Sequence, residues 1–417
     1  MIEIKPLARC AAEITIPGSK SYTHRALIVA ALAAGTSFLS NALKSEDTLY
    51  TAQGLEKMGI KIIWERGGVR VAGKGGVFKK GEEKIYLGNS GTSMRFLTAL
   101  AALREGRTYL DGSERMRERP MGELIRALRT LKIKAYALKN DGCPPIVVES
   151  QGLAGGQVTL KGSQSSQFLS ALFLISPYSQ RDMAIEVDGP LASKPYLDMT
   201  REVMSAFGVE VEGDFPSFLI RSGQRYLPQN YLIDGDASNA SYFWAAAAIT
   251  KGRVRVDNLR PYSAQGDLKF LDLLKRMGCQ VIHREKGIEV QGGPLQAIEA
   301  DMNSMPDVVP TLAVVAAFAA GETTIYNIGH LRFKESDRLK AVATELNKIG
   351  IKVEEGQDWL KITGGQPHGA EIETYQDHRI AMSFAIAGLA VPGVRIKGED
   401  CVSKSFPSFW ETLQQLY

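Results

Sequence analysis

The sequence predicts an α/β protein whose 417 residues form six repeats, grouped as two domains of three. Two series of motifs support this prediction, because both recur about every seventy residues. In the first series, a turn rich in glycine, hydroxyl or amide groups stands directly before an apolar helix pattern. These turns begin at Gly18, Gly88, Gly162, Gly235, Ser304 and Gln376, at intervals of 70, 74, 73, 69 and 72 residues.

The second series marks the end of a further helix in the first five repeats. Segments such as LEKMGIKI and LNKIGIKV end a helix pattern, mostly at a glycine, and continue into a β-rich strand. The turning points are Gly59, Lys132, Gly208, Gly278 and Gly350, at intervals of 73, 76, 70 and 72 residues. One repeat therefore reads strand, helix, strand, helix and further strand, and it cannot bury its own apolar faces.

The two ends of the chain predict how the repeats are grouped. The helix pattern at Pro407–Leu416 has no strand after it, and the strand pattern at Met1–Leu7 has no helix before it. The N-terminal strand would therefore complete the last repeat and make one domain discontinuous. We expect one domain of residues 1–17 and 232–417 and an inserted domain of residues 18–231. The glycine-capped helix starts of both domains would then converge on one cleft.

Composition narrows the class of protein. A net charge of +4 is too weak to indicate nucleic-acid binding, but basic residues gathered in one place would suit a small acidic ligand. The four cysteines form no CxxC, and the five histidines lack metal-ligand spacing, so we expect no disulfide and no metal. No apolar run approaches eighteen residues and no signal-peptide core is present. These features favour a cytoplasmic protein without a membrane partner.

The first two helix-start turns have the composition of anion sites. In GSKSYTHR, Lys20 and Arg25 add fixed charges to the unpaired N–H groups of a helix start, and Ser21 adds a hydroxyl. The alternative is an ordinary helix cap with two solvated cations. The segment is not a Walker A loop. In GNSGTSMR, Gly91 would let the backbone approach a ligand closely, and the alternative is a plain glycine turn.

Three further stretches carry polar groups that suit a polyhydroxylated or phosphorylated ligand. In RMRERP, an extended chain would point Arg115, Arg117 and Arg119 to one side, with Pro120 opening the next helix. The alternative is a surface network of ion pairs with nearby glutamates. The run SQSSQ at residues 163–167 supplies hydrogen-bonding groups and no titratable group, and the segment SKPY at residues 193–196 adds a hydroxyl and a phenol.

The densest cluster of charge is RFKESDR, residues 332–338. On a helix, Lys334 and Arg338 would share one face, with Glu335 one turn before Arg338. A carboxylate between cations is suited to proton transfer near an anionic substrate, and the alternative is an exposed helix laced with ion pairs. Asp307 occupies the repeat position of Lys20. The last repeat has His378 and Arg379 at that position, and SKSFP near the C-terminus contains Lys404.

Together these stretches resemble the 5-enolpyruvylshikimate-3-phosphate (EPSP) synthases of the enolpyruvyl transferase family. The resemblance spans the chain through PGSKSYTHRAL, LGNSGTSMR, GSERMRERPM, SSQFLSAL, SKPYLDMT, GDASNASYF, PDVVPTLAV, RFKESDRL, YQDHRIAMSF and SKSFPSFW. It implies two domains of three βαβαββ units each, the inside-out α/β barrel of this family, with the active site in the interdomain cleft. It also implies transfer of the enolpyruvyl group of phosphoenolpyruvate to the 5-hydroxyl of shikimate-3-phosphate. Neither a cofactor nor a metal would be needed, and the protein would be a monomer and a target of glyphosate.

The resemblance also implies roles for single residues. Asp307 would be the base near the 5-hydroxyl, Glu335 would take part in proton transfer at the methylene carbon, and Lys20 would contact both substrates. The family commonly has asparagine where this chain has His330. The residues implied to hold shikimate-3-phosphate are Lys20, Ser21, Arg25, Ser165, Ser166, Gln167, Ser193, Tyr196, Asp307 and Lys334. Those implied to hold phosphoenolpyruvate are Lys20, Gly91, Arg115, Gln167, Glu335, Arg338, Arg379 and Lys404.

Three other functions are compatible with parts of the pattern. The sister transferase that acts on UDP-N-acetylglucosamine uses a cysteine in the region that corresponds to Gly112–Pro120, where this chain has none. A non-catalytic protein that binds phosphorylated metabolites would keep the cations but would not need Asp307 and Glu335 together. A nucleic-acid enzyme of related repeats is disfavoured by the weak net charge and by the lack of interleaved aromatic residues.

Overall fold

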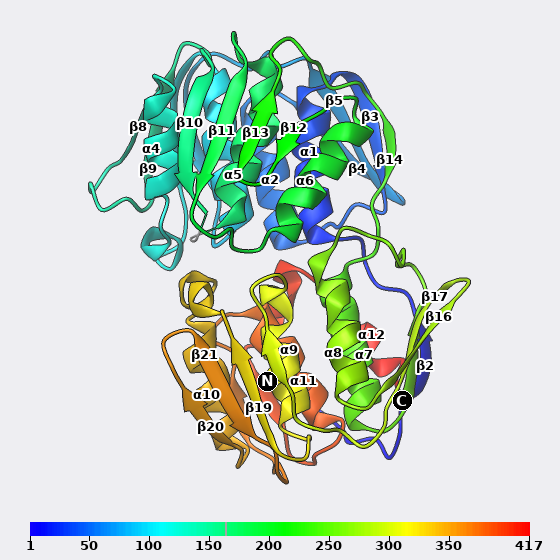
Figure 1. Cartoon of the computed structure of the whole chain (residues 1–417). Coiled ribbons are helices and arrows are strands. Elements are labelled where there is room, and N and C mark those ends of the chain that lie inside the picture. The colour runs from blue at the N-terminus through cyan, green and yellow to red at the C-terminus, as the bar shows by residue number, and fades with distance from the viewer. Residues whose placement is uncertain (163–164) are drawn as a thin grey trace. The chain divides into compact units, whose positions relative to one another are not determined.

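The computed structural model describes residues 1–162 and 165–417 and divides into two compact units (Figure 1). The inserted unit is Gly18–Ile233, and the terminal unit is Met1–Pro17 together with Asp234–Tyr417. The second crossing therefore follows Ile233, two residues after the expected boundary at residues 231–232. Each unit contains three sheets and three repeats, and each is described by itself.

The inserted unit carries repeats one to three, each with two α-helices between its strands. Repeat one consists of α1 (Lys20–Leu32), β3 (Ala34–Ser40), α2 (Glu46–Lys57), β4 (Lys61–Glu65) and β5 (Gly68–Lys74), with β14 (Asn230–Leu232) at its edge. Repeat two consists of β6 (Gly81–Tyr86), α3 (Gly91–Leu100), β7 (Gly106–Asp111), α4 (Gly122–Thr130), β8 (Lys134–Ala137) and β9 (Ile146–Ser150). Repeat three consists of β10 (Gly156–Lys161), α5 (Ser166–Ile175), β11 (Met183–Asp188), α6 (Pro195–Ala206), β12 (Glu212–Asp214) and β13 (Ser217–Ile220). Three 3-10 turns, η1 (Ala101–Leu103), η2 (Met116–Glu118) and η3 (Ser176–Tyr178), lie between them.

The terminal unit carries repeats four to six, with 3-10 turns before several of its helices. Repeat four consists of β2 (Ala11–Ile14), α7 (Ala237–Ile249), β15 (Arg253–Val256), η4 (Gly266–Lys269), α8 (Phe270–Arg276), β16 (Gln280–Arg284) and β17 (Gly287–Gln291). Repeat five consists of β18 (Glu299–Asp301), η5 (Pro306–Val308), α9 (Val309–Ala316), β19 (Glu322–Tyr326), η6 (Gly329–Phe333), α10 (Arg338–Lys348), β20 (Lys352–Glu355) and β21 (Trp359–Thr363). Repeat six consists of β22 (Glu371–Glu373), α11 (His378–Gly388), β23 (Arg395–Lys397), η7 (Glu399–Lys404) and α12 (Phe409–Gln414), with β1 (Ile2–Glu3) in its sheet.

The sheets share one plan in which a parallel pair continues into an antiparallel hairpin. In repeat two the order is β6-β7-β9-β8, with β6 parallel to β7 and the last two strands antiparallel. The sixth sheet has three strands, and β1 pairs antiparallel with β23 so that Ile2 lies opposite Ile396. The segments at the crossings supply the outer strands β14, parallel to β3, and β2, parallel to β15. Each unit thus takes an edge strand from a distant part of the chain.

The second helices end where the sequence predicts, because the backbone there turns left-handed. Gly59, Gly208, Gly278 and Gly350 have φ of 95°, 84°, 105° and 85°, which glycine adopts without strain. Lys132 ends α4 with φ of 66°, although a side chain makes this conformation less favourable. The spacing of these ends reflects the same turn from helix to strand in five repeats.

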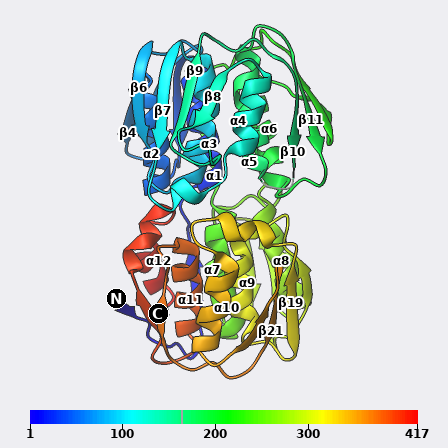
Figure 2. The same ribbon diagram turned by 90° about the vertical axis from the view of Figure 1, so that its left-hand side faces the viewer.

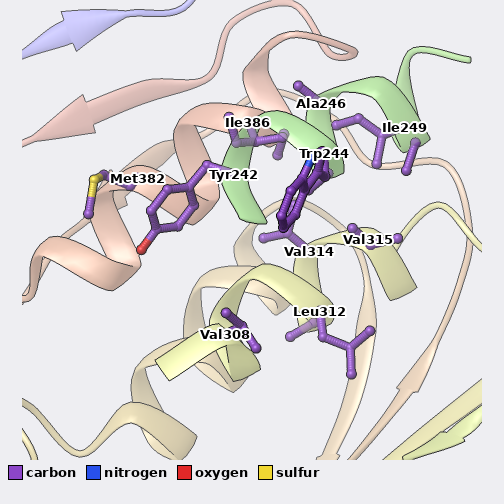
Figure 3. Packing of buried hydrophobic residues seen from close by; sticks show 14 of the residues in the cluster. Tyr242, Trp244, Ala246, Ile249, Val308, Leu312, Val314, Val315, Met382 and Ile386 are labelled. Atoms are coloured by element: carbon purple, nitrogen blue, oxygen red, sulfur yellow. The ribbon is translucent and has the colours of Figure 1, made fainter. Parts of the chain in front are cut away.

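The first helices of the repeats form the centre of each unit. Every residue of α7, α9 and α11 is buried, as is every residue of α1 except Ser21. A helix that is apolar on all sides must be covered on all sides, so these helices lie inside and the sheets outside. Figure 2 shows α3 and α5 within the inserted unit and β6, β7, β10 and β11 at its edges. In the terminal unit, Trp244 of α7, Leu312 of α9 and Ile386 of α11 pack in one core (Figure 3).

Two local predictions are wrong. The C-terminal helix α12 begins at Phe409, two residues later than expected from Pro407. The segment 332–338 is not one helix, because η6 ends at Phe333, Lys334 is extended and α10 begins only at Arg338. Asp337 caps α10 by accepting a hydrogen bond from the Lys340 amide at 3.2 Å, and this cap sets the helix start. Lys334 and Arg338 therefore do not share a helix face.

In the parts of the chain that the structure describes, no helix is long and apolar enough to span a membrane.

Candidate active site

In the terminal unit, Asp307 lies between two buried arginines. Its Oδ1 accepts from Nη1 of Arg338 at 3.0 Å, and its Oδ2 accepts from Nη2 of Arg379 at 3.0 Å. The turn η5, just before α9, supplies Asp307, whereas α10 and α11 begin with the arginine-bearing turns. Three helix starts from two repeats therefore meet at one carboxylate. Two adjacent guanidinium groups favour its ionised form, which a base requires.

Arg338 joins three carboxylates. Besides Asp307, it contacts Glu335 at 2.7 Å through Nη2 and Asp377 at 2.8 Å through Nε. Its side chain is only 1% exposed. Burial alone would lower the pKa of Arg338, but Asp377, Glu335 and Asp307 together raise it above its ordinary value. Glu335 is thus held beside Asp307 by a shared cation rather than by a helix face.

Arg379 is fixed from two sides by oxygen atoms. Nη1 donates to the Tyr242 hydroxyl at 3.1 Å, and the backbone N–H donates to Asp377 Oδ1 at 2.9 Å. Nε has no hydrogen-bond partner among the described residues. Burial raises the pKa of Tyr242 to about 12, so its phenol stays neutral and leaves the Arg379 charge to Asp307 and to any bound anion.

Three further candidates of this unit lie in turns rather than in helices. Lys334 follows η6, and Lys404 ends η7 and is only 5% exposed. Burial, and next the positive charge of Lys334, lowers the pKa of His330 to about 4. The His330 ring is therefore neutral at pH 7, and its Nε2 has no partner among the residues described. A neutral imidazole can donate or accept one hydrogen bond in the place of an amide.

In the inserted unit, the start of α1 presents a cation within a cap. Ser19 is the N-cap, and Lys20 is the first residue of the helix. Nζ of Lys20 contacts Oδ2 of Asp47 at 3.2 Å, and Asp47 lies in the first turn of α2. Both side chains are almost fully buried. The ion pair fixes the lysine at the helix start, where backbone N–H groups add positive potential.

Arg25 lies one turn further along α1 and is surrounded by neutral oxygens. Nε donates to Thr200 Oγ1 at 2.7 Å, and Nη2 donates to the Tyr196 carbonyl at 2.8 Å and to Ser170 Oγ at 3.4 Å. Nη1 donates to the Ser21 carbonyl at 2.8 Å. No carboxylate pairs with Arg25 in the described part of the chain, and burial lowers its pKa to about 10. It remains charged at pH 7, so an anion nearby would be favoured.

The start of α5 adds hydrogen-bonding groups to this unit. Ser165 caps the helix by accepting from the Gln167 amide at 3.2 Å, and Nε2 of Gln167 donates to Thr92 Oγ1 at 3.1 Å. Gln167 is thereby joined to the first turn of α3, which begins at Gly91. Ser166 is buried, and Ser193, before α6, has a left-handed φ of 58°. Ser163 and Gln164 of the SQSSQ run lie outside the described residues.

The arginines of RMRERP do not share one side, because Met116–Glu118 form the 3-10 turn η2 instead of an extended strand. Arg115 pairs with Glu118 at 2.7 Å, with 30% of its side chain exposed, and Arg117 pairs with Asp111 at 2.6 Å. Arg119 is only 4% exposed and donates to the Asn89 carbonyl at 3.1 Å. The following helix begins at Gly122 and not at Pro120.

Arg119, rather than Arg115, lies against Gly91. A Cβ on Gly91 would stand 2.5 Å from Nη2 of Arg119 and 2.3 Å from Nη1 of Arg95. Glycine at this position is therefore explained by two guanidinium groups that lie close to the backbone at the start of α3. Arg119 belongs to the same RMRERP motif as Arg115, the residue that the resemblance implies for phosphoenolpyruvate.

Asp47 and Asp377 belong to the networks, although the sequence motifs do not predict them as site residues. Both stand at helix starts, Asp47 in the first turn of α2 and Asp377 as the N-cap of α11. Asp377 directly precedes the chosen His378 and Arg379. The recurring glycines mark only the ends of the second helices, whereas Asp47 lies at the start of one, where an acidic first turn is the available signal.

Comparisons with known proteins agree on one family. The family model described as EPSP synthase (3-phosphoshikimate 1-carboxyvinyltransferase) matches residues 4–413. A 3-phosphoshikimate 1-carboxyvinyltransferase of Nostoc punctiforme is 49% identical, over 100% of this chain and 99% of the relative. That of Syntrophobacter fumaroxidans is 44% identical, over 99% of each chain. The solved EPSP synthase of Acinetobacter baumannii superposes with a TM-score of 0.83 at 29% identity, over 99% of this chain and 97% of the other. The α/β fold of repeated units predicted from the sequence is confirmed, and the chain belongs to the EPSP synthase (3-phosphoshikimate 1-carboxyvinyltransferase) family.

Proposed function

We propose that this chain transfers the enolpyruvyl group of phosphoenolpyruvate to the 5-hydroxyl of shikimate-3-phosphate and releases phosphate. Membership of the family supports the reaction, and the chemistry of the two networks supports the assignment of residues. The hydroxyl oxygen adds to C2 of phosphoenolpyruvate while C3 gains a proton, which forms a tetrahedral intermediate. Loss of phosphate from C2 and of a proton from C3 then restores the enol ether. The reaction needs groups that accept and return protons beside groups that hold anions.

The observation that carries the proposal is the pair of carboxylates on Arg338. Asp307 and Glu335 contact the same guanidinium at 3.0 and 2.7 Å. We assign Asp307 to the proton of the 5-hydroxyl and Glu335 to the proton at C3. Lys20, whose ammonium group lies at a helix start, assists at the phosphate and at C3. A binding protein for phosphorylated metabolites would have no need of two carboxylates held in this way.

We assign the remaining residues to binding. Shikimate-3-phosphate is held by Lys20, Ser21, Arg25, Ser165, Ser166, Gln167, Ser193, Tyr196, Asp307 and Lys334. Phosphoenolpyruvate is held by Lys20, Gly91, Gln167, Glu335, Arg338, Arg379 and Lys404, and by Arg119 instead of Arg115, the residue that the resemblance implies. The burial of Arg119 beside Gly91 supports this change. A monomer located in the cytoplasm remains our expectation.

Phosphate release tests the function directly. The purified protein is mixed with phosphoenolpyruvate and shikimate-3-phosphate, and with each substrate alone. Release that needs both substrates is the expected result. Release with UDP-N-acetylglucosamine in place of shikimate-3-phosphate would assign the chain to the sister reaction, and binding without release would indicate a non-catalytic protein.

A further inference from the structure

Asp267, in η4 of the terminal unit, is a buried acid to which the proposed reaction gives no role. It is 5% exposed. Its Oδ2 shares a hydrogen bond with the hydroxyl of Ser238 in the first turn of α7, and its Oδ1 is buried without a partner among the described residues. A buried carboxylate oxygen that no donor reaches destabilises the charged form, whereas a neutral acid loses much less. The local geometry therefore favours a protonated Asp267.

The carboxylates around Asp267 act in the same direction. The turn η4 packs against α7, η5 and α8. From these elements and from α11, the groups that act on Asp267 are Asp236, Asp307 and Arg379. On α8, Asp272 and Lys275 pair with each other at 3.4 Å at the surface, and Arg276 donates to the Glu299 carbonyl at 2.6 Å. Burial first, and then the charge of Asp307, raises the pKa of Asp267 to about 7, against the smaller opposite effects of Ser238 and Arg379.

Asp267 of repeat four and Asp47 of repeat one occupy corresponding positions, but the two acids contact different kinds of side chain. Asp47 lies in the first turn of the second helix of repeat one and pairs with Lys20, the first residue of α1. Asp267 begins the second helical segment of repeat four, but α7 starts with Ala237 and Ser238. The acid of repeat four thus faces a hydroxyl instead of an ammonium group. No cation on α7 balances its negative charge.

We infer that Asp267 is a proton-carrying positioning residue that must be neutral when an anion binds at Arg379. This inference rests on the proposed function, in which Arg379 holds phosphoenolpyruvate. An ionised Asp267 would add a third negative charge to those of Asp236 and Asp307, and this charge would oppose an arriving anion. A proton taken from solvent onto Asp267 removes the opposition. Binding of phosphoenolpyruvate near pH 7 is therefore coupled to proton uptake by Asp267.

The variant Asp267→Asn tests the coupling, because asparagine keeps the shape and the hydrogen bond to Ser238 but cannot ionise. We expect the KM for phosphoenolpyruvate of the native protein, divided by that of the variant, to rise about tenfold between pH 6 and pH 9, the effect of one pKa unit of coupling. Titration of the phosphate on the ligand is common to both proteins and cancels in this ratio. A ratio that stays constant over this range would overturn the inference.

Two measurements keep the test decisive if the variant folds poorly. Carbon-13 NMR of native protein labelled at the aspartate carboxyl carbons should show one carboxyl that titrates near pH 7 and moves to higher pH when phosphoenolpyruvate is added. Ser238→Ala, which removes the remaining hydrogen bond, should move that titration upward. Aspartates that all titrate below pH 5 would overturn the inference. Failure of the native protein to release phosphate at any pH would instead overturn the proposed function.

Discussion

Arg25 of the inserted unit and Arg338 of the terminal unit are equally buried, each 1% exposed, but they are held in opposite ways. Arg25 donates only to neutral oxygens, and burial lowers its pKa to about 10. Arg338 contacts three carboxylates, which raise its pKa despite burial. The charge of Arg25 is therefore left for an anion, whereas the charge of Arg338 orders the acids around it.

The difference leads us to propose that the two units use one topology for two tasks. Both place polar side chains at the starts of buried helices, where backbone N–H groups are unpaired. In the inserted unit the starts of α1, α3 and α5 carry hydroxyl and amide groups with a cation, which suit binding. In the terminal unit they carry carboxylates held by arginines, which suit proton transfer. The predictions below test this division in order of the expected effect.

The largest effect is expected from Asp307→Asn in the terminal unit. Asparagine keeps the size of the side chain but cannot take a proton, so kcat should fall by about 10²–10⁴-fold. The Kd for shikimate-3-phosphate, measured by calorimetry, should change less than about tenfold. Glu322→Gln, which alters an acid paired with Lys361 at 2.8 Å on the surface, is the matched control and should leave kcat unchanged. A variant that keeps kcat and loses affinity would show that Asp307 only positions the arginines.

Arg119→Lys and Arg115→Lys form the next pair, in the inserted unit. Lysine keeps the charge but loses the planar fork, and hydrogen bonds of a charged group contribute about 1.5–3 kcal/mol. We expect Arg119→Lys to raise the KM for phosphoenolpyruvate by roughly 10–100-fold on this basis. Arg115→Lys, at the exposed pair with Glu118, should change it less than about threefold. A larger rise in KM for Arg115→Lys than for Arg119→Lys would indicate that Arg115, and not Arg119, binds phosphoenolpyruvate.

How far the sequence predicts this molecule depends on the kind of feature. The six repeats are predictable because five left-handed helix ends recur with one spacing, and Gly59 or Gly350 is easily recognised. The orientation of the arginines in RMRERP is less predictable. Whether Arg115, Arg117 or Arg119 turns inward depends on the 3-10 turn at Met116–Glu118, and periodicity does not distinguish such a turn from an extended chain.

The same limit applies to Glu335 and Arg338. A helical reading of residues 332–338 brings them together by spacing, and the structure also joins them, but across the cap at Asp337. The contacts of Arg338 with Asp307 and Asp377 link positions 31 and 39 residues apart. Such contacts depend on how the repeats pack against one another, which a single sequence does not reveal. The sequence therefore predicts which residue types are present in the site, but not which of them contact each other.

The third prediction concerns the stability of the terminal unit at acidic pH. The folded protein holds His330 with a pKa of about 4, below the ordinary value of 6.5. Stability from this neutral ring is fully present above pH 6.5 and is lost as the pH falls towards 4, because the unfolded chain binds the proton first. Between pH 7 and pH 4.5 the native protein should lose up to about 2–3 kcal/mol more than His330→Asn, as measured by urea unfolding. Equal losses would show that His330 carries a charge in the folded protein.

The smallest effect is expected from Gly91→Ala, which tests whether the start of α3 in the inserted unit contributes to binding. The new Cβ would stand 2.3 and 2.5 Å from guanidinium nitrogens of Arg95 and Arg119, the mobile ends of long side chains. These groups can shift, so the free energy of unfolding should change by less than about 1 kcal/mol. The displaced arginines should raise the KM for phosphoenolpyruvate by about three- to tenfold, equivalent to about 0.7–1.4 kcal/mol, with kcat nearly unchanged.

Gly122→Ala is the matched control for this last substitution. Gly122 also begins a helix, α4, and a Cβ there would meet nothing within 4 Å. It should leave both KM values unchanged. If Gly91→Ala raised the KM of both substrates equally, the arginines beside it would serve the whole ligand pair. An effect on phosphoenolpyruvate alone would instead assign Arg119 and the start of α3 to that substrate.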